Sequence, residues 1–329
     1  MNSYDVVLLG ETMLRLTPPN GQRIAQAKQF DIEIGGSESN TAVGLARLGL
    51  QVAWLSRLPN SPLGEFVAQN IRRYGVDMQH VVWADDSRLG LYFWEDAATP
   101  RPNLVIYDRK HSAISEMRPK ELPSDLFVNG RSQHLHLTGI TPALSTAAAK
   151  TAQRAAQLAA EVGWRVSFDL NFRSKLWSAE EARIGCEPFM QMAELLITPI
   201  RDAQTIYDLD EATAPEAVLN YLAEQYPNKM IVMTLGSDGA MGLDGNGRIH
   251  HQPIIPTEGT DRLGSGDAFA AGLLYGLYFD GNTSSLANGL RWGTAMAAMK
   301  RTITGDVPLV DKTAVAQLVS ADQAPKDVR

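Results

Sequence analysis

The sequence is dominated by an alternation of short β-branched segments with amphipathic helical segments, and no other feature limits the possible folds as strongly. The predicted strands are 5–9, 52–57, 133–138, 165–170, 194–198 and 229–235. The predicted helices are 37–48, 64–74, 143–162, 178–191, 213–225, 267–279 and 284–300. This pattern predicts a single α/β domain over residues 1–329, with a central, mostly parallel sheet flanked by helices on both faces. Ligands of such sheets bind beyond the carboxyl ends of the strands, so polar residues there are the first site candidates.

Three segments depart from this alternation: 12–17, 29–34 and 88–109. Their apolar and polar residues repeat with a period of two, which is typical of strands that bury one face. We interpret them as a small antiparallel sheet beside the main domain, and we call this sheet the lid. A sheet of this size is only marginally stable alone, so one face is expected to lie on an active site or on a second subunit.

The composition is that of an ordinary globular protein, with 44% hydrophobic and 20% charged residues. A formal net charge of −7 argues against binding to nucleic acid or to anionic membranes. Cys186 is the only cysteine, so no intrachain disulfide can form, and we interpret it as a helix-packing residue. Because there is no basic leader and no apolar run near the roughly 18 residues of a membrane span, a cytoplasmic protein is expected.

The segment with the clearest chemical meaning is Asp261–Asp267, which we call the glycine turn. Here Gly264, Ser265 and Gly266 lead directly into a helix of small residues, so their backbone N–H groups and that of Asp267 can point together at an anion. A carboxylate at Asp267 is placed to take a proton from a hydroxyl that attacks a bound phosphate. The alternative is that Asp267 only caps a helix beginning at residue 268.

A second glycine pair, Gly35-Gly36, stands at the end of a predicted strand and before a predicted helix. Glycines let a ligand lie against the backbone, and the nearby Asn40 can both donate to and accept from hydroxyl groups. The alternative is a tight turn followed by a helix cap. Neither a Walker-type phosphate loop nor a dinucleotide fingerprint after the first strand occurs, which disfavours a Rossmann oxidoreductase.

The two glycine segments, in this order, resemble the two signature motifs of the ribokinase-like (PfkB) carbohydrate kinases. The resemblance implies a ribokinase-like α/β fold, with Gly264, Ser265 and Gly266 as an anion hole and Asp267 as the catalytic base. It also implies transfer of a phosphoryl group from ATP, with Mg²⁺, to a primary hydroxyl of a sugar, and a homodimer formed through the lid. Thr234-Leu235-Gly236-Ser237-Asp238-Gly239 is similar to the family's nucleotide-binding turn. By that likeness the nucleotide-binding residues are Thr234, Gly236, Ser237, Gly239, Gly264 and Gly266.

Within the family, Asp169–Arg173 with the following Leu176-Trp177, and Tyr107–Arg109, resemble segments of the 2-keto-3-deoxygluconate kinases. The resemblance implies phosphorylation of 2-keto-3-deoxygluconate at its 6-hydroxyl. The implied substrate-binding residues are Gly35, Gly36, Asn40, Tyr92, Tyr107, Arg109, Arg173 and Asp306. A guanidinium suits the carboxylate of a sugar acid, because it can donate two parallel hydrogen bonds to it. The alternatives are that Arg109 is a solvated charge on an edge strand and that Arg173 is a surface residue.

Two segments differ from the family pattern. Arg262-Leu263 stand where relatives often have two threonines, so a requirement for K⁺ is left open. Pro199–Asp202 replace an N-x-x-E motif associated with Mg²⁺, so no metal ligand is assigned except, provisionally, Asp202. The rival functions are a fructokinase or another neutral-sugar kinase and, more distantly, a non-catalytic protein that binds sugars or nucleotides.

Overall fold

The computed structural model describes residues 3–19, 21–97, 100–258 and 261–320. Its main sheet has the order β14-β13-β12-β11-β10-β9-β1-β4-β5, and β6 also pairs with β4. From one edge these strands are β14 (Ile249–Gln252), β13 (Ala240–Leu243), β12 (Met230–Thr234), β11 (Leu195–Pro199), β10 (Arg165–Asp169), β9 (Ser132–Thr138), β1 (Tyr4–Leu9), β4 (Val52–Pro59), β5 (Val76–Asp77) and β6 (Val81–Ala84). All six predicted strands of this sheet are confirmed, and the sheet is parallel except at β13 and β14.

The alternating side chains of β1 explain why its sequence is apolar throughout. Val6 and Leu8 belong to one buried cluster, and Val7 and Leu9 belong to a second cluster. A strand covered by helices on both faces has no polar side, so it is a continuous apolar run. Burying a side chain of this kind contributes about 1.5–3 kcal/mol, which makes the central strands the most stable part of the sheet.

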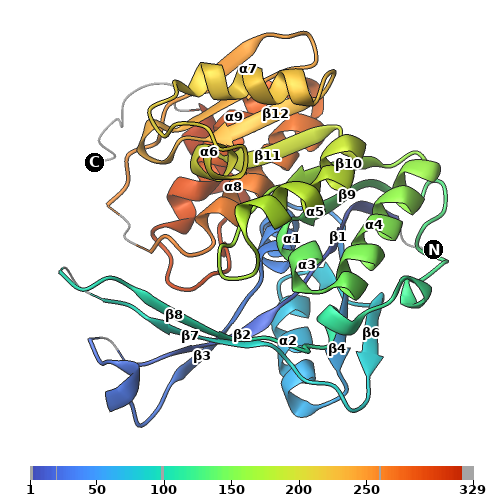
Figure 1. Ribbon diagram of the computed structural model, residues 1–329, viewed down its shortest axis with the longest axis vertical. Helices are drawn as coiled ribbons and strands as arrows, with labels where there is room; N and C mark the ends of the chain where they lie inside the picture. The colour runs from blue at the N-terminus through green and yellow to red at the C-terminus, as the bar shows by residue number, and fades with distance from the viewer. Residues whose placement is uncertain (1–2, 20, 98–99, 259–260, 321–329) are drawn as a thin grey trace.

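The helices divide between the two faces of the sheet, as predicted (Figure 1). The helices that contribute to the cluster of Val6 and Leu8 are α1 (Ser37–Arg47), α2 (Pro62–Arg72), α8 (Ser265–Leu274), α9 (Leu286–Lys300) and α10 (Lys312–Ser320). The other cluster is covered by α3 (Ile140–Leu144), α4 (Thr146–Glu161), α5 (Ala179–Met192), α6 (Ile200–Ile206) and α7 (Pro215–Gln225). Helix α8 continues as a π-helical turn, Tyr275–Phe279. Short 3₁₀ turns occur at Ile24–Gln26, Ile114–Glu116, Pro119–Glu121, Gly236–Asp238 and Gly281–Thr283.

Serine residues fix the starts of four helices. The hydroxyls of Ser61, Ser145, Ser178 and Ser285 each accept a backbone N–H from the first turn of α2, α4, α5 and α9. Such caps satisfy a donor that the helix itself cannot. The cap at Ser145 also divides the predicted helix 143–162 into α3 and α4.

The lid is a four-stranded sheet of order β3-β2-β7-β8 that projects from the main domain (Figure 1). Its strands are β2 (Met13–Thr17), β3 (Asp31–Gly35), β7 (Leu91–Glu95) and β8 (Leu104–Asp108). The prediction of a separate small sheet is confirmed, but its central pair, β2 with β7, is parallel rather than antiparallel. Both strands run outward from the main domain, whereas β3 and β8 run back toward it. Of the predicted range 88–109, residues 98–99 lie outside the described residues.

The register of the lid gives it two chemically different faces. A row across one face consists of Glu33, Arg15, Tyr92 and Tyr107. The adjacent row, on the other face, consists of Ile32, Leu16, Phe93 and Ile106. Because side chains alternate along each strand, one face is polar where the other is apolar. Among the described residues, no helix is long and apolar enough to cross a membrane.

Candidate active site

A cavity of about 660 Å³ opens beyond the carboxyl ends of β11 and β12. This is the edge of a parallel sheet at which ligands are expected. The lining residues are Pro199, Ile200, Arg201, Asp202, Thr234, Leu235, Gly236, Ser237, Gly239, Ile254, Ile255, Arg262, Ser265, Gly266, Phe269, Thr294, Ala297, Ala298 and Arg301. The residues Thr234, Gly236, Ser237 and Gly239, predicted to bind nucleotide, therefore line one cavity with Gly266, whereas Gly264 is not among its lining residues.

The apolar wall of this cavity was not predicted. It consists of Ile254, Ile255, Phe269, Ala297 and Ala298. In the sequence these residues resemble ordinary core positions, because an apolar side chain has the same pattern whether it packs against protein or against a ligand. Such an apolar wall, in a cavity that also has polar groups, is suited to a flat aromatic ring.

The glycine turn has the geometry of an anion site. Gly264 precedes α8 with a left-handed φ of 70°, and a Cβ there would lie 1.8 Å from the carbonyl oxygen of Asp306, so only glycine fits. The N–H of Ser265 donates to Arg262 O at 3.3 Å. Among the described residues, the N–H groups of Gly266 and Asp267 have no hydrogen-bond acceptor. Two free donors at a helix N-terminus can bind a phosphate oxygen.

Asp267 does not cap α8, which begins at Ser265 rather than at residue 268. Its Oδ1 accepts a hydrogen bond of 2.7 Å from Ser37 Oγ, and its Oδ2 accepts one of 2.7 Å from Asn40 Nδ2. Burial raises the pKa of Asp267 above its ordinary value, and these two hydrogen bonds oppose the increase. A carboxylate with a raised pKa, beside two free backbone N–H donors, is chemically able to accept a proton from a hydroxyl.

Asn40 brings the first glycine segment to Asp267. Its Nδ2 is used by Asp267, but its Oδ1 is buried and has no hydrogen-bond donor among the described residues. A buried amide oxygen without a donor is costly, so a ligand hydroxyl at this point would be stabilised. Ser37 Oγ in turn accepts a hydrogen bond of 2.9 Å from Asn171 Nδ2. Asn171 was not predicted as a site residue, although it lies within the segment Asp169–Arg173.

The polar face of the lid reaches the main domain at Asp306. This carboxylate accepts hydrogen bonds from Tyr92 Oη and from the guanidinium of Arg15, which also pairs with Glu33. A Cβ at Gly35 would lie 2.3 Å from Tyr92 Oη and 2.5 Å from Asp306 Oδ2, so the glycine leaves room for this contact. Arg15 and Glu33 were missed, although both lie in segments predicted to form the lid.

Arg109 is not the solvated edge charge of the alternative interpretation, because it is buried. Its Nε donates to Glu11 Oε2 at 2.8 Å, and its Nη2 contacts the same oxygen. Its guanidinium also lies 5.3 Å from the ring centroid of Tyr107. Glu11 was not predicted as a partner. It follows the first strand, where an acidic residue could have been noted.

Arg173 is exposed, and among the described residues its guanidinium has no hydrogen bond or ion pair. Its charge lowers the pKa of three nearby carboxyls, Asp169, Asp202 and Asp267. Burial outweighs this effect and raises the pKa of Asp169 to about 8 and that of Asp202 to about 6. Arg173 is therefore an exposed positive charge near enough to Asp267 to lower the pKa of its carboxyl.

Residues 3–312 match the pfkB family of carbohydrate kinases. The chain belongs to this family. The 2-dehydro-3-deoxygalactonokinase of Haloferax volcanii is 39% identical over 323 residues, which cover 98% of this chain and 99% of that protein. The 2-dehydro-3-deoxygluconokinase of Bacillus subtilis is 28% identical over 322 residues, with coverages of 97% and 96%.

The fold of this kinase is also that of solved relatives. The crystal structure of the 2-dehydro-3-deoxygluconokinase of Thermotoga maritima has a TM-score of 0.88 and 33% sequence identity, and the match covers 97% of this chain and 99% of that one. The predicted ribokinase-like architecture is confirmed, and the protein is a sugar kinase.

Histidines do not contribute to the site of this kinase. His134 and His136 are buried on β9, and both contact the hydroxyl of Ser167, at 2.7 and 2.8 Å. Burial lowers the pKa of both rings, that of His136 to about 3. Across the described ranges, no group of three or more His, Cys, Asp or Glu side chains is arranged to hold a metal ion.

Proposed function

We propose that this kinase transfers the terminal phosphoryl group of ATP to the 6-hydroxyl of 2-keto-3-deoxygluconate, or of its galactonate epimer. The observation that supports this most directly is the position of Asp267, whose carboxylate lies between two groups that can bind a ligand. On one side are the free N–H groups of the glycine turn, and on the other is the buried, donor-free Oδ1 of Asn40. A hydroxyl held by Asn40 would lie between a base and an anion site.

In the proposed mechanism ATP occupies the 660 Å³ cavity. The apolar wall binds the adenine ring, and the turn at 234–239 contacts the nucleotide. Asp267 accepts the proton of the sugar hydroxyl as its oxygen attacks the terminal phosphorus. The N–H groups of Gly266 and Asp267 stabilise the negative charge on the transferring group. Ser37 and Asn40 hold the carboxylate of Asp267 in place for this step.

The cavity also suits a magnesium ion held mainly by phosphate oxygens. Asp202 is the one carboxylate among the described residues that line it, and its Oδ2 accepts a hydrogen bond from Phe172 N at 2.9 Å. Mg²⁺ in such sites is bound through one or two carboxylates, the substrate phosphates and water. Bound there, the ion would neutralise charge on the phosphates. Asp202 would take part of the role of the missing N-x-x-E motif.

The acidic part of the sugar is proposed to contact Arg173 and the lid. Arg173 is unpaired and lies near Asp267, so it can bind a carboxylate. Tyr92 and Tyr107 on the polar face of the lid, and Asp306 on the main domain, offer hydrogen-bonding groups. Gly35 makes room for the contact between Tyr92 and Asp306, and a Cβ at Gly36 would lie 2.0 Å from Glu11 O, so these two glycines let the lid pack closely beside the proposed sugar site.

One observation favours the rival substrate class, a neutral sugar such as fructose. The guanidinium of Arg109 already has a carboxylate partner, Glu11, so it does not require a substrate carboxylate to balance its charge. The sugar-acid assignment therefore depends mainly on Arg173 and on the relatives that are named as kinases of 2-dehydro-3-deoxy sugar acids.

An ADP-release assay with Mg-ATP separates these substrates. The panel consists of 2-keto-3-deoxygluconate, 2-keto-3-deoxygalactonate, fructose and ribose. We expect kcat/KM for at least one of the two sugar acids to exceed that for fructose by on the order of 10²-fold, the discrimination given by one charge-assisted contact. A preference for fructose would overturn the sugar-acid assignment and leave the kinase class intact. Turnover of none of the four sugars, by a protein that binds Mg-ATP, would favour a non-catalytic binding protein.

The apolar face of the lid supports a homodimer. Ile32 and Ile106 are 53% and 45% exposed, and they lie in one row with Leu16 and Phe93. A second copy of the lid would cover this row. We expect sedimentation analysis to give a dimer for the wild type and a monomer for Ile106→Arg. The matched control is Ile184→Arg, at a 60% exposed isoleucine on α5, which should leave the dimer intact.

A further inference from the structure

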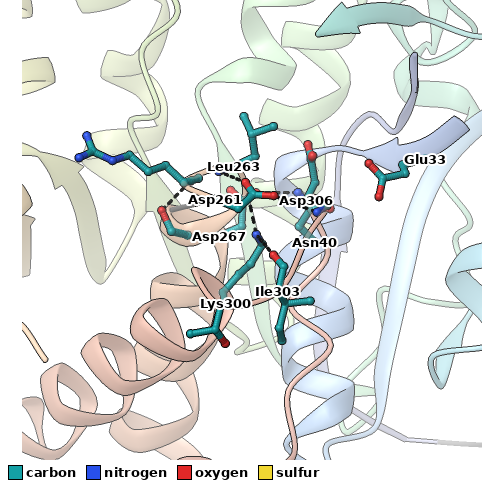
Figure 2. A network of polar contacts seen from close by, with 12 residues as sticks. Glu33, Asn40, Asp261, Leu263, Asp267, Lys300, Ile303 and Asp306 are labelled. Carbon is teal, nitrogen blue, oxygen red and sulfur yellow. Dashed lines mark hydrogen bonds and ion pairs between the residues drawn. The ribbon is translucent and has the colours of Figure 1, made fainter. Parts of the chain in front are cut away.

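Lys300 is a fully buried lysine beside the glycine turn. It is the last residue of α9, and its side chain has no exposed surface. Its Nζ donates to Ile303 O at 2.9 Å and lies 3.7 Å from Asp261 Oδ1, as Figure 2 shows. Lysine is rarely buried completely, because its charge loses hydration that few contacts can replace. Its position therefore calls for an explanation.

Asp261 extends this ion pair to two segments of the site. Its Oδ1 accepts from Leu263 N at 3.0 Å, and its Oδ2 accepts from Gly305 N at 3.0 Å. Leu263 belongs to the glycine turn, and Gly305 directly precedes Asp306. Figure 2 shows Asp261 at the centre of these contacts, with Asp267 and Asp306 close by. The ammonium of Lys300 thus supports the carboxylate that ties the two segments together.

The two segments must keep a fixed spacing. Gly264 packs so closely on the backbone of Asp306 that a Cβ would lie 1.8 Å from its carbonyl oxygen. A shift of the segment around Asp306 would therefore move the N–H groups of Gly266 and Asp267. Misplacement of a reacting group by about 1 Å can reduce a rate on the order of 10²-fold.

We propose that Lys300 is a positioning residue for phosphoryl transfer and that its ammonium is a built-in cation for the glycine turn. With Asp261, it holds the turn and the segment of Asp306 in register. Because the ammonium already lies between the oxygens of Asp261 and Ile303, this kinase needs no added K⁺ at this place. The inference rests on the proposed function, since it assigns the glycine turn to phosphate binding.

The alternative is that Lys300 only caps the C-terminus of α9. A lysine in the last turn is favourable there through its charge and through a bond to a free carbonyl. A cap contributes to stability alone. A built-in cation affects the order of the glycine turn and kcat, and a small external cation can replace it.

The test uses Lys300→Ala and Lys300→Met, with Lys229→Met as the matched control. Lys229 also donates to backbone carbonyls at the C-terminal end of a helix, those of Gln191 and Ala193 at the end of α5, both at 2.7 Å, and neither residue lines the 660 Å³ cavity. Activity is measured with tetramethylammonium as the only monovalent cation and again after addition of K⁺ or NH₄⁺. Hydrogen exchange of residues 261–270 is followed under the same conditions.

We expect the wild type to have the same kcat, within about twofold, with and without K⁺. Lys300→Ala and Lys300→Met should lose kcat on the order of 10²-fold, the cost of a misplaced reacting group. Exchange at 261–270 should become faster in both variants. In Lys300→Ala the vacated space is lined by the oxygens of Asp261 and Ile303. Addition of NH₄⁺ or K⁺ should therefore restore part of the lost kcat and part of the lost protection from exchange. Lys229→Met should change neither kcat nor the hydrogen exchange of residues 261–270.

Three results would overturn the proposal: a wild type that requires K⁺, a Lys300→Met variant with kcat within twofold of the wild type, or variants with lower stability that do not respond to cations. The last result would make Lys300 a cap only. Hydrogen exchange needs no sugar, so it decides the positioning role even if the proposed sugar substrate is wrong. A wild type inactive on every sugar contradicts the proposed function, whereas a cation-insensitive turn in Lys300→Ala contradicts this inference.

Discussion

Asp267 is the residue on which the proposed chemistry depends most. Asp267→Asn keeps the size of the side chain but removes its ability to accept a proton, so we expect kcat to fall by about 10²–10⁴-fold. The fold should persist, because the amide can still hydrogen-bond to Ser37 and Asn40 after one of these bonds reorients. Steady-state kinetics measures the loss, and calorimetric titration with the sugar should still detect binding. A variant with more than about a tenth of the wild-type kcat would contradict the role of Asp267 as the base.

Arg173 and Arg201 provide a paired test of the two substrate sites. Arg173 lies near Asp267, whereas Arg201 lines the cavity proposed for ATP. Removing a charge-assisted contact to a ligand costs about 2–5 kcal/mol when the contact is buried. Because Arg173 is exposed, we expect a smaller effect, about a tenfold increase in KM for the sugar acid. Arg173→Ala should leave KM for ATP unchanged, and Arg201→Ala should raise KM for ATP alone.

The same kinetics distinguishes a sugar acid from a neutral sugar. If Arg173→Ala raises KM for fructose as much as for the sugar acid, Arg173 does not recognise a carboxylate. Arg109 is less suitable for this test than the sequence indicated. Arg109→Ala would leave the buried carboxylate of Glu11 without its partner, at a cost of about 3–5 kcal/mol in stability.

At the scale of elements, the lid is the part expected to respond to the sugar. It contacts the main domain through the apolar side chains of Leu14 and Ile34 and through the buried hydrogen bonds of Tyr92 and Arg15 to Asp306. We expect bound sugar to slow hydrogen exchange in β7 and β8, because it adds contacts across the polar face. Strand β9, in the middle of the main sheet, is the internal control and should not change. Equal protection of β7 and β8 with and without sugar would show that the lid does not close over the substrate.

The pattern of the elements also explains which predictions were accurate. The parallel strands and long helices were identified because their periodicity is local and strong. Strand β13 and helix α6 were missed as elements, because each is short and directly follows another strand or turn. The parallel pairing of β2 with β7 could not be deduced either, since it depends on the direction in which two distant segments leave the main domain.

At the scale of the whole molecule, buried carboxyls should make stability depend on pH. Burial raises the pKa of Glu38 to about 7, and those of Asp202 and Asp169 to about 6 and 8. Each group keeps its proton in the folded state over a pH range in which the unfolded chain has lost it. Through these carboxyls the folded state binds more protons, so they lower the free energy of unfolding as pH rises. His134 and His136, whose pKa burial lowers, act in the opposite direction below about pH 6.5.

Above about pH 6.5 the carboxyls act without this opposition, so we expect the free energy of unfolding to decrease between about pH 6.5 and pH 8, by a few kcal/mol in total. Glu38→Gln removes one of these groups while keeping an oxygen that accepts from Thr138 and Thr141. This variant should show a shallower decrease than the wild type in urea unfolding at pH 6.5 and 8. A wild type whose stability rises over this range would contradict the assignment of raised pKa values.

The sequence by itself determined the α/β class, the separate lid, and the turns from which the site is built. These features depend on backbone conformation and on local periodicity, which neighbouring residues specify. Gly264 is an example, because glycine adopts the left-handed backbone conformation found directly before α8 without steric strain.

Only the tertiary structure decided which side chains meet. Arg15 pairs with Asp306 although the two residues are 291 positions apart in the sequence. Asn40 and Asp267 are 227 positions apart, and Arg109 and Glu11 are 98 positions apart. The environment of Asp267 and the burial of Lys300 are set in the same way. A contact, a raised pKa or a buried charge depends on how the whole chain closes around a residue, and that closure depends on packing between distant segments.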